Sequence, residues 1–294
     1  MTNMPKEISL IVPIFNGTKY IKQFIDPLNS NFFKGQVIFV DNCSTDNSHR
    51  IIEDYCKKNN NFKLVSYSKK KSSYAARNYG VKFSRNNIIA FTDIDCIPTK
   101  SYLNFLSSFN GNFDLMTGPI NVFYKKKNIY EIFDKNTYLL QEYYVKNNYA
   151  ATANLVITRE VFNLVGGFPE FTSGGDNKFC KKCIDMGFKI HFENNLMILH
   201  PARGTFFDHI SKAKRLGIGH GEIFNESYKN FYNFLKYFSK NLLSIFIPLN
   251  SIRVYLKINQ KEKINFFNNL KLIFLAFSVN LVQRLFIIKT LLRR

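Results

Sequence analysis

Two aspartates, Asp93 and Asp95, stand one residue apart in the segment TDIDC, directly after the apolar run NIIAF. Divalent cations such as Mg²⁺ and Mn²⁺ prefer oxygen ligands, and proteins often hold them by carboxylates together with nucleotide phosphates. An apolar run that ends in two carboxylates therefore indicates a strand that leads into a metal site. A solvated loop carries the same pattern, so the pair alone leaves both interpretations open.

Short apolar runs alternate with amphipathic segments through the first hundred residues, and the elements that they form must position these carboxylates. Strands are predicted at 8–15, 36–41, 62–67 and 87–93, with helices between them at 20–28, 46–58 and 73–84. This alternation predicts a parallel sheet with helices on both faces, and ligands of such sheets bind beyond the carboxyl ends of the strands. The polar loops PIFNG, DNCSTDN and TDIDC fall at these ends.

The middle of the chain is less regular. Further strands are predicted at 114–124 and 151–158, a helix at 129–145, a loop with four glycines at 166–176, and a helix followed by a strand within 176–190.

The chain has 294 residues and a formal net charge of +20, from 41 Lys and Arg against 21 Asp and Glu. Hydrophobic residues make up 46%, which is enough for a core and excludes wholesale disorder. The bases concentrate in two stretches, with nine and no acid in 57–85 and twelve against three acids in 222–294. Such an excess predicts a polyanionic partner: nucleic acid, an anionic membrane surface or a phosphorylated small molecule.

From Phe231 onward the chain is rich in Phe, Leu and Ile with interspersed Lys and Arg, and its longest uncharged run, 272–283, is shorter than the roughly 20 residues that span a bilayer. This pattern favours interfacial helices on an anionic membrane surface. Two core helices of a small subdomain and a re-entrant hairpin stay open as alternatives. No signal-like segment begins the sequence, and its five cysteines show no framework spacing. We therefore expect a cytoplasmic protein, peripheral on the inner face of the cytoplasmic membrane.

Four segments, IVPIFNG, VDNCSTDNS, AARNYG and FTDIDC, occur in this order over the first hundred residues. Together they resemble the nucleotide-sugar-binding half of the family 2 glycosyltransferases, inverting enzymes with the GT-A fold. The later segment GGFPEFTSGGDNKFCKKCIDMGF resembles the acceptor side of the same family. The resemblance implies an α/β fold with a mixed, mainly parallel, Rossmann-like sheet, flanking helices and a C-terminal helical extension. It implies a catalytic domain over 1–225, with a nucleotide-sugar half over 1–110 and an acceptor half over 111–225, and an extension over 226–294.

The resemblance implies that residues near the ends of the first two predicted strands bind the base of the nucleotide. The wall of the base pocket corresponds to Pro13, Phe15 and Asn16. Asp41 corresponds to a carboxylate that accepts a hydrogen bond from uracil or another base, although a turn or cap residue of DNCSTD would look the same.

Three further residues correspond to positions near the nucleotide. Arg77 and Asn78 lie in AARNYG, where Arg77 is expected to hold the diphosphate or the base, unless it is a residue of an exposed helix surface. Arg203 has a planar guanidinium that suits a diphosphate oxygen.

The resemblance implies Mn²⁺ or Mg²⁺ as the cofactor. Asp93 is expected to face the ribose and the metal, Asp95 to bind the metal directly, and His200 to bind the metal or lie near the phosphates. A hydrogen-bonded loop histidine is the alternative interpretation of His200. Such a cation offsets the charge that develops on the leaving nucleoside diphosphate.

Asp176, in SGGDNKF, corresponds to the catalytic base that deprotonates the acceptor hydroxyl as it attacks C1 of the sugar. It begins a predicted helix, whose dipole favours an ionised carboxylate; a helix cap after two glycines is the structural alternative, and both roles are compatible. Gly175 stands where many relatives have Glu, which leaves one candidate base. Lys178 stands where an acid is often found, which puts the acceptor contact of that acid in question.

The resemblance predicts transfer of a hexose or N-acetylhexosamine from a nucleoside-diphosphate sugar, with UDP-sugars favoured, to a lipid-linked or lipopolysaccharide- or capsule-type glycan. A nucleotidyltransferase and a basic nucleic-acid-binding protein are the alternatives. Base-stacking modules interleave aromatic residues with Lys and Arg on a sheet face, and residues 57–85 offer little of this, so nucleic acid is not an expected partner.

Overall fold

The computed structural model describes residues 8–29, 33–109, 112–228 and 230–293, which form two compact units. Unit 1 comprises Met1–Val122, Leu139–Glu170 and Gly175–His200, and unit 2 comprises Phe123–Tyr138, Phe171–Gly174 and Pro201–Arg294. Residues 1–7 begin the segment in which we expect no signal peptide, and they lie outside the described residues. Residues 110–111, at the predicted division of the catalytic domain into two halves, also lie outside them. The predicted domain boundary at residue 225 stays a prediction.

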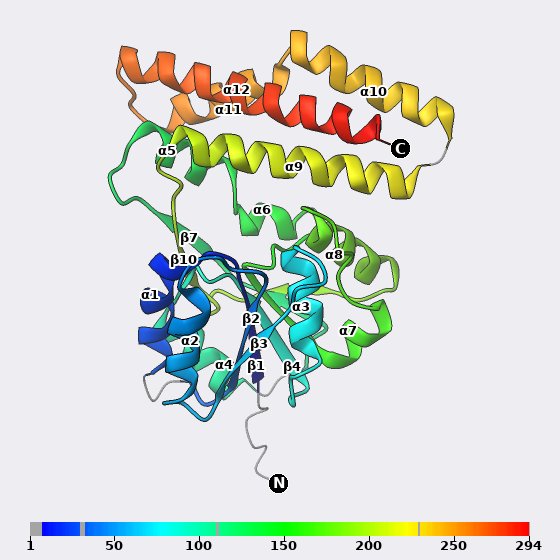
Figure 1. Ribbon diagram of the computed structural model, residues 1–294. Coiled ribbons are helices and arrows are strands. Elements are labelled where there is room, and N and C mark those ends of the chain that lie inside the picture. Colours follow the sequence, from blue (N-terminus) through cyan, green and yellow to red (C-terminus); the bar gives the residue numbers. More distant parts are fainter. Residues whose placement is uncertain (1–7, 30–32, 110–111, 229, 294) are drawn as a thin grey trace. The chain divides into compact units, whose positions relative to one another are not determined.

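Unit 1 is built on a seven-stranded sheet with the order β3-β2-β1-β4-β8-β6-β9 (Figure 1). Its strands are β1 (Ile8–Ile14), β2 (Gln36–Asp41), β3 (Phe62–Ser66), β4 (Ile88–Thr92), β6 (Leu115–Thr117), β8 (Asn154–Thr158) and β9 (Ile190–Phe192). The first four strands are parallel, and β8 runs antiparallel to both of its neighbours. A second sheet has the order β5-β10-β7, formed by β5 (Ile97–Pro98), β10 (Ile198–Pro201) and β7 (Ile120–Phe123).

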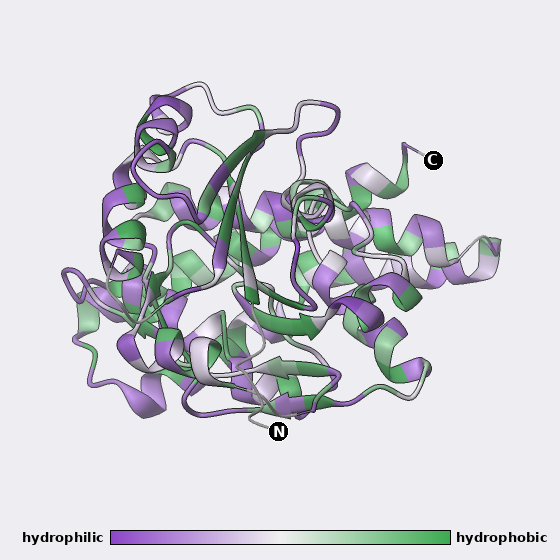
Figure 2. Ribbon diagram, turned by 90° about the horizontal axis from the view of Figure 1, so that it is seen from below, coloured by the Kyte–Doolittle hydropathy of each residue, from purple (hydrophilic) through white to green (hydrophobic). Residues whose placement is uncertain are grey.

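Helices cover both faces of the larger sheet because the buried apolar residues of its strands divide between two cores, one on each face. In Figure 2 the hydrophobic colour covers much of the central strands. One face packs against α1 (Thr18–Leu28), α2 (Ser48–Cys56) and α4 (Lys100–Ser108). The other packs against α3 (Ser73–Val81), α7 (Arg159–Val165) and α8 (Gly175–Asp185). Successive residues of β1 divide between the two cores, with Leu10 in the first and Ile11 in the second.

Unit 2 is helical. It consists of α5 (Ile129–Thr137), α9 (Phe206–Ser227), α10 (Phe231–Phe246), α11 (Leu249–Lys261) and α12 (Phe266–Leu291). Its main core joins α5, α9, α11 and α12. Among the described residues, only α12 has the length and apolar composition to cross a membrane, and a third of its most apolar window is buried inside the fold.

Three predicted elements are divided in the structure. The predicted helix 129–145 separates into α5 in unit 2 and α6 (Gln141–Val145) in unit 1, with Leu139 between them at a φ of 56°. The predicted strand 114–124 separates into β6 and β7 at Gly118, where a Cβ would lie 2.4 Å from the carbonyl oxygen of Glu193. The described C-terminal residues form three helices, whereas the alternative of a small subdomain has two, because the chain breaks at Pro248.

The predicted fold class is confirmed. The described residues form a mixed, mainly parallel sheet with helices on both faces, followed by a C-terminal helical region. The parallel strands place their carboxyl ends, and therefore the predicted site loops, at one edge of the sheet.

Candidate active site

The loops that follow β1 and β2 are tied together by hydrogen bonds. The backbone N–H of Asn16 donates to Ser44 Oγ at 3.1 Å, and the side-chain oxygen of Asn16 accepts from the backbone N–H of Thr45 at 2.8 Å. Asn16 has a φ of 51°, in the left-handed region that asparagine tolerates better than most residues. Asn16 therefore holds the two loops in register.

The three residues predicted to wall the base pocket differ in position. Phe15 and Asn16 are exposed, and the ammonium group of Lys71 lies 3.8 Å from the centroid of the Phe15 ring. Pro13 is buried inside β1, opposite Val40 of β2. The pairing of β1 with β4 ends at Ile11, so a residue without an N–H is tolerated beyond that point.

Asp41 is the last residue of β2, and both of its carboxylate oxygens have partners. Oδ1 accepts from the backbone N–H of Ser44 at 3.1 Å, and Oδ2 lies 3.0 Å from Nδ1 of His49. The Asp41 side chain is largely buried, whereas His49 is nearly half exposed. The carboxylate is thereby fixed at the edge of the sheet where a base is predicted to bind.

Arg77, in α3, forms an ion pair with Asp93 through Nη2 and Oδ1. The Arg77 side chain is 2% exposed and that of Asp93 is 36% exposed, so the pair joins a buried cation to a carboxylate that is open to solvent. Arg77 therefore places a positive charge beside the Asp93–Asp95 segment.

Asn78 links α3 to the segment that precedes α8. Its side-chain nitrogen donates to the carbonyl oxygen of Phe168 at 2.8 Å, and its side-chain oxygen accepts from the Phe168 N–H at 2.9 Å. Both ends of the amide are used in this clamp. The predicted contact of Asn78 with the nucleotide stays a prediction.

Asp95 and His200, 105 positions apart in the sequence, come together through the pairing of β5 with β10. This antiparallel pairing sets Ile198 opposite Pro98 and Leu199 opposite Ile97. The next step of the register brings His200 to the turn that contains Asp95, where Nε2 of His200 lies 3.4 Å from Oδ2 of Asp95.

These two side chains fit neighbouring positions on one cation. Two donors that each lie about 2.1 Å from a metal ion, at right angles, are separated by about 3 Å, close to the observed spacing. Within the described residues, no group of three or more His, Cys, Asp or Glu side chains is arranged to hold a metal ion. A cation here would therefore take further ligands from phosphate and water, as Mg²⁺ commonly does.

Asp176 lies at the start of α8, is 7% exposed and accepts four hydrogen bonds. Oδ1 accepts from the Tyr74 hydroxyl and the Asn177 N–H, both at 2.9 Å. Oδ2 accepts from the Tyr149 hydroxyl and the Thr152 N–H, both at 3.3 Å. Burial, followed by the Asp176 carboxylate, raises the pKa of Tyr74 and of Tyr149, so both hydroxyls stay protonated and donate.

The glycine before Asp176 is explained by close packing. A Cβ on Gly175 would lie 2.5 Å from the carbonyl oxygen of Pro169 and 2.9 Å from the ring of Tyr74. The space that a glutamate would need at position 175 is therefore taken by the same tyrosine that binds Asp176.

Arg203 is held within unit 2 by Asp134, which is almost fully buried. Nη1 of Arg203 lies 3.0 Å from Oδ1 of Asp134, and the Arg203 N–H donates to Oδ2 at 3.1 Å. Burial opposes ionisation of Asp134, but its basic neighbours, chiefly Arg203, outweigh this and lower its pKa. The contact of Arg203 with a diphosphate stays a prediction.

Three partners of the candidate carboxylates do not emerge from the sequence analysis: His49 beside Asp41, and Tyr74 and Tyr149 beside Asp176. For Tyr74 a signal exists, since it lies three residues before Arg77 on the same side of the predicted helix. Tyr149 follows α6 in a loop, where no periodic pattern indicates its direction.

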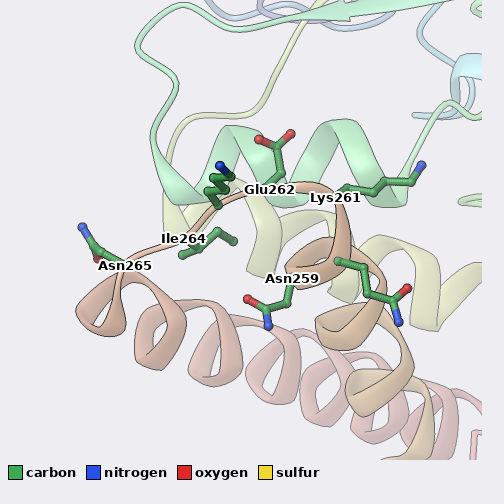
Figure 3. A pocket seen from close by; sticks show the side chains of 7 residues that line it. Asn259, Lys261, Glu262, Ile264 and Asn265 are labelled. Carbon is green, nitrogen blue, oxygen red and sulfur yellow. The ribbon is translucent and has the colours of Figure 1, made fainter.

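A hollow in unit 2 lies at the turn between α11 and α12 (Figure 3). Its lining residues are Asn259, Gln260, Lys261, Glu262, Lys263, Ile264 and Asn265. They include a single carboxylate, Glu262, which accepts a hydrogen bond from the Tyr124 hydroxyl at 3.2 Å. The hollow lacks paired carboxylates, so we assign the candidate site to the loops of unit 1.

The sequence is similar to those of known proteins. The family model described as "Glycosyl transferase family 2" matches residues 9–165. Glycosyltransferase AglE of Haloferax volcanii is 31% identical over 227 residues, which are 74% of each chain. Glycosyltransferase GlyG of Streptococcus pneumoniae is 27% identical over 104 residues, which are 35% of each chain.

Solved structures share the fold. A mannosyltransferase from Pyrobaculum calidifontis, in complex with GDP-Man and Mn²⁺, aligns with a TM-score of 0.55 and 18% identity over 79% of this chain and 68% of that one. TarS of S. aureus, in complex with UDP-GlcNAc, aligns with a TM-score of 0.53 and 20% identity over 78% of this chain and 69% of that one. At these identities the likeness concerns the GT-A fold alone. The family match and the similarity to AglE show that the chain belongs to glycosyltransferase family 2 and is a glycosyltransferase.

Proposed function

We propose that this glycosyltransferase transfers a hexose or N-acetylhexosamine, with inversion at C1, from a nucleoside-diphosphate sugar to a lipid-linked or lipopolysaccharide- or capsule-type glycan. The observation that carries the proposal is that Nε2 of His200 lies 3.4 Å from Oδ2 of Asp95, in the segment FTDIDC that resembles the family's nucleotide-sugar-binding half. The proposed catalytic domain is 1–225, and the proposed membrane-associated extension is 226–294.

Asp176 is the proposed catalytic base. As the acceptor hydroxyl attacks C1 from the face opposite the diphosphate, its proton passes to Asp176 and a new bond forms between C1 and the acceptor oxygen. The bond from C1 to the diphosphate oxygen breaks, and its electron pair leaves with the nucleoside diphosphate. This order of bond formation and bond cleavage inverts the configuration at C1 and needs a single base.

The proposed metal ligands are Asp95 and His200, with Asp93 beside them in its ion pair with Arg77. The mannosyltransferase from P. calidifontis is described with Mn²⁺, which supports Mn²⁺ or Mg²⁺ here. When bound, the cation offsets charge on the leaving diphosphate. Asp41 and Phe15 are the proposed contacts of the nucleotide base, and Arg77 supplies positive charge near the phosphates.

A panel of nucleotide sugars in the presence of Mn²⁺ tests the donor. UDP-sugars are expected to raise the melting temperature, because a ligand at 100 times its Kd stabilises the native state by about 2.7 kcal/mol. Asp41→Asn should reduce this rise, since Asp41 is the proposed contact of the base. Mass spectrometry of the products should show sugar transfer, and release of pyrophosphate would instead indicate nucleotidyl transfer. A chain that no nucleotide sugar stabilises would contradict the proposal.

The proposed membrane contact rests on the exposed apolar side chains of unit 2. Six aromatic side chains of α10 and α12 are at least 65% exposed: Phe231, Tyr232, Phe246, Phe266, Phe267 and Phe274. Exposed basic side chains occur in the same stretch of sequence, at Lys236, Lys240, Arg253, Lys257 and Lys271. Two polar side chains of α12 instead bond inside unit 2: Arg284 Nη1 donates to Asn241 Oδ1 at 2.8 Å, and the side-chain nitrogen of Asn280 donates to the carbonyl oxygen of Ser244 at 2.9 Å. This arrangement supports helices that lie on an anionic leaflet, on the cytoplasmic side.

The double variant Phe266→Ser/Phe267→Ser is expected to weaken binding to vesicles that contain phosphatidylserine by more than tenfold. Burial of each phenylalanine contributes about 1.5–3 kcal/mol, and about 1.4 kcal/mol corresponds to a factor of ten. Cosedimentation of the full chain measures the effect, and Phe207→Ser, which removes an exposed phenylalanine of α9, is the matched control. A wild-type chain that never cosediments with these vesicles would overturn the proposal.

A further inference from the structure

Asp176 is held unequally by its four hydrogen-bond donors. The two bonds to Oδ1, from Tyr74 and Asn177, are 2.9 Å long. The two bonds to Oδ2, from Tyr149 and Thr152, are both 3.3 Å long. A carboxylate offers about four acceptor positions, so all of them are occupied, and the weaker pair lies on one oxygen.

We propose that the two oxygens of Asp176 have different roles: Tyr74 anchors Oδ1, while Oδ2 exchanges its bond from Tyr149 for the acceptor hydroxyl and takes its proton. This inference rests on the proposed function and adds to it two positioning residues, Tyr74 and Tyr149, that act through Asp176. The proton moves from the acceptor hydroxyl to Oδ2 as the bond from the acceptor oxygen to C1 forms and the diphosphate leaves.

The packing around Tyr74 and Tyr149 supports these different roles for the two oxygens of Asp176. Tyr74 is 6% exposed, and its ring also fills the space beside Gly175, so its hydroxyl has little freedom to turn away. Tyr149 lies in a loop, and its hydroxyl is 3.3 Å from Oδ2, against 2.9 Å between the Tyr74 hydroxyl and Oδ1, so the bond from Tyr149 is the weaker of the two and the more readily exchanged.

The ionisable groups that face this cluster come from several elements. Arg77 contributes from α3, Cys180 from α8, and Tyr144 from α6. Arg77 is already paired with Asp93, and burial raises the pKa of the Cys180 thiol, which stays neutral. The two tyrosine hydroxyls are therefore the side-chain donors that stabilise the ionised form of Asp176 most directly.

Tyr74→Phe and Tyr149→Phe test the proposal in the full chain, each keeping the ring and removing one hydroxyl. Carbon-13 NMR of the Asp176 carboxyl at neutral pH, assigned with Asp176→Asn, should show a changed chemical shift in each variant, because one hydrogen bond to the carboxylate is lost. Tyr79→Phe is the matched control: Tyr79 also lies in α3, but its ring packs on Tyr67 and Phe83, and the carboxyl resonance should not move.

Measurements of turnover distinguish the proposed roles of Oδ1 and Oδ2 of Asp176. With the nucleotide sugar that stabilises the chain most, release of nucleoside diphosphate at neutral pH should fall about tenfold in Tyr74→Phe, because the anchor is lost, and change less than about threefold in Tyr149→Phe. An unchanged carboxyl resonance in both variants, or equal losses of turnover, would overturn the inference. If Asp176→Asn itself keeps full turnover, the proposed base is wrong, and this outcome is distinct because the NMR spectrum does not depend on activity.

Discussion

Asp176→Asn is expected to lower the turnover of the donor sugar by about 10²–10⁴-fold, the range that general-base catalysis contributes. Asparagine keeps the size of the side chain, and its oxygen still accepts hydrogen bonds, but it takes no proton at neutral pH. The partners of Asp176 are Tyr74, Tyr149 and backbone N–H groups, so binding of the nucleotide sugar should be preserved. Initial rates of nucleoside diphosphate release and calorimetry of donor binding measure the two effects separately.

Asp185→Asn is the matched control, because Asp185 is the last residue of the same helix and is exposed. Its turnover should equal that of the wild-type chain. Wild-type rates for Asp176→Asn would remove Asp176 as the base. A variant that also unfolds would show the helix-cap role instead, and thermal melting distinguishes the two results.

Asp95→Asn is expected to lower turnover by about 100-fold or more and to weaken Mn²⁺ binding in the same variant. A metal ion contributes several kcal/mol of charge stabilisation in such reactions, and each 1.36 kcal/mol is tenfold in rate. The substitution removes the charge of one of the two donors that lie 3.4 Å apart. Electron paramagnetic resonance of Mn²⁺ measures binding without donor or acceptor.

His200→Gln should also weaken Mn²⁺ binding, because His200 and Asp95 are both assigned as ligands of one cation. Asp54→Asn is the control, since Asp54 is exposed on α2. Chelation with EDTA should stop turnover of the wild-type chain, and Mn²⁺ should restore it. An Asp95→Asn variant with full Mn²⁺ binding would contradict the assignment.

Much of the parallel part of the larger sheet is readable from local pattern. The strands predicted at 8–15, 36–41, 62–67 and 87–93 differ from β1 to β4 by one residue at most at each end. Strands buried on both faces form continuous apolar runs, and polar loops must follow them, so short windows of sequence suffice to find both.

The pattern fails where one apolar segment serves two cores. Residues 129–145 keep a helical spacing throughout, yet Ile132 and Phe133 pack in the core of unit 2, whereas Gln141 bonds to Thr117 and Ala151 in unit 1. A continuous helix cannot supply both, and the chain turns at Leu139. Periodicity records that a side chain is buried but not which neighbours bury it.

The sequence by itself determined the family, the alternating strands and helices, and the placing of Asp41, Asp93 and Asp95 at strand ends. Only the tertiary structure decided which side chains meet these groups and Asp176. Sheet register brings His200 to Asp95 across 105 positions, and helix packing brings Tyr74 to Asp176 across 102. The physical reason is that secondary structure follows from neighbours along the chain, whereas the geometry of a site depends on how distant segments pair and pack.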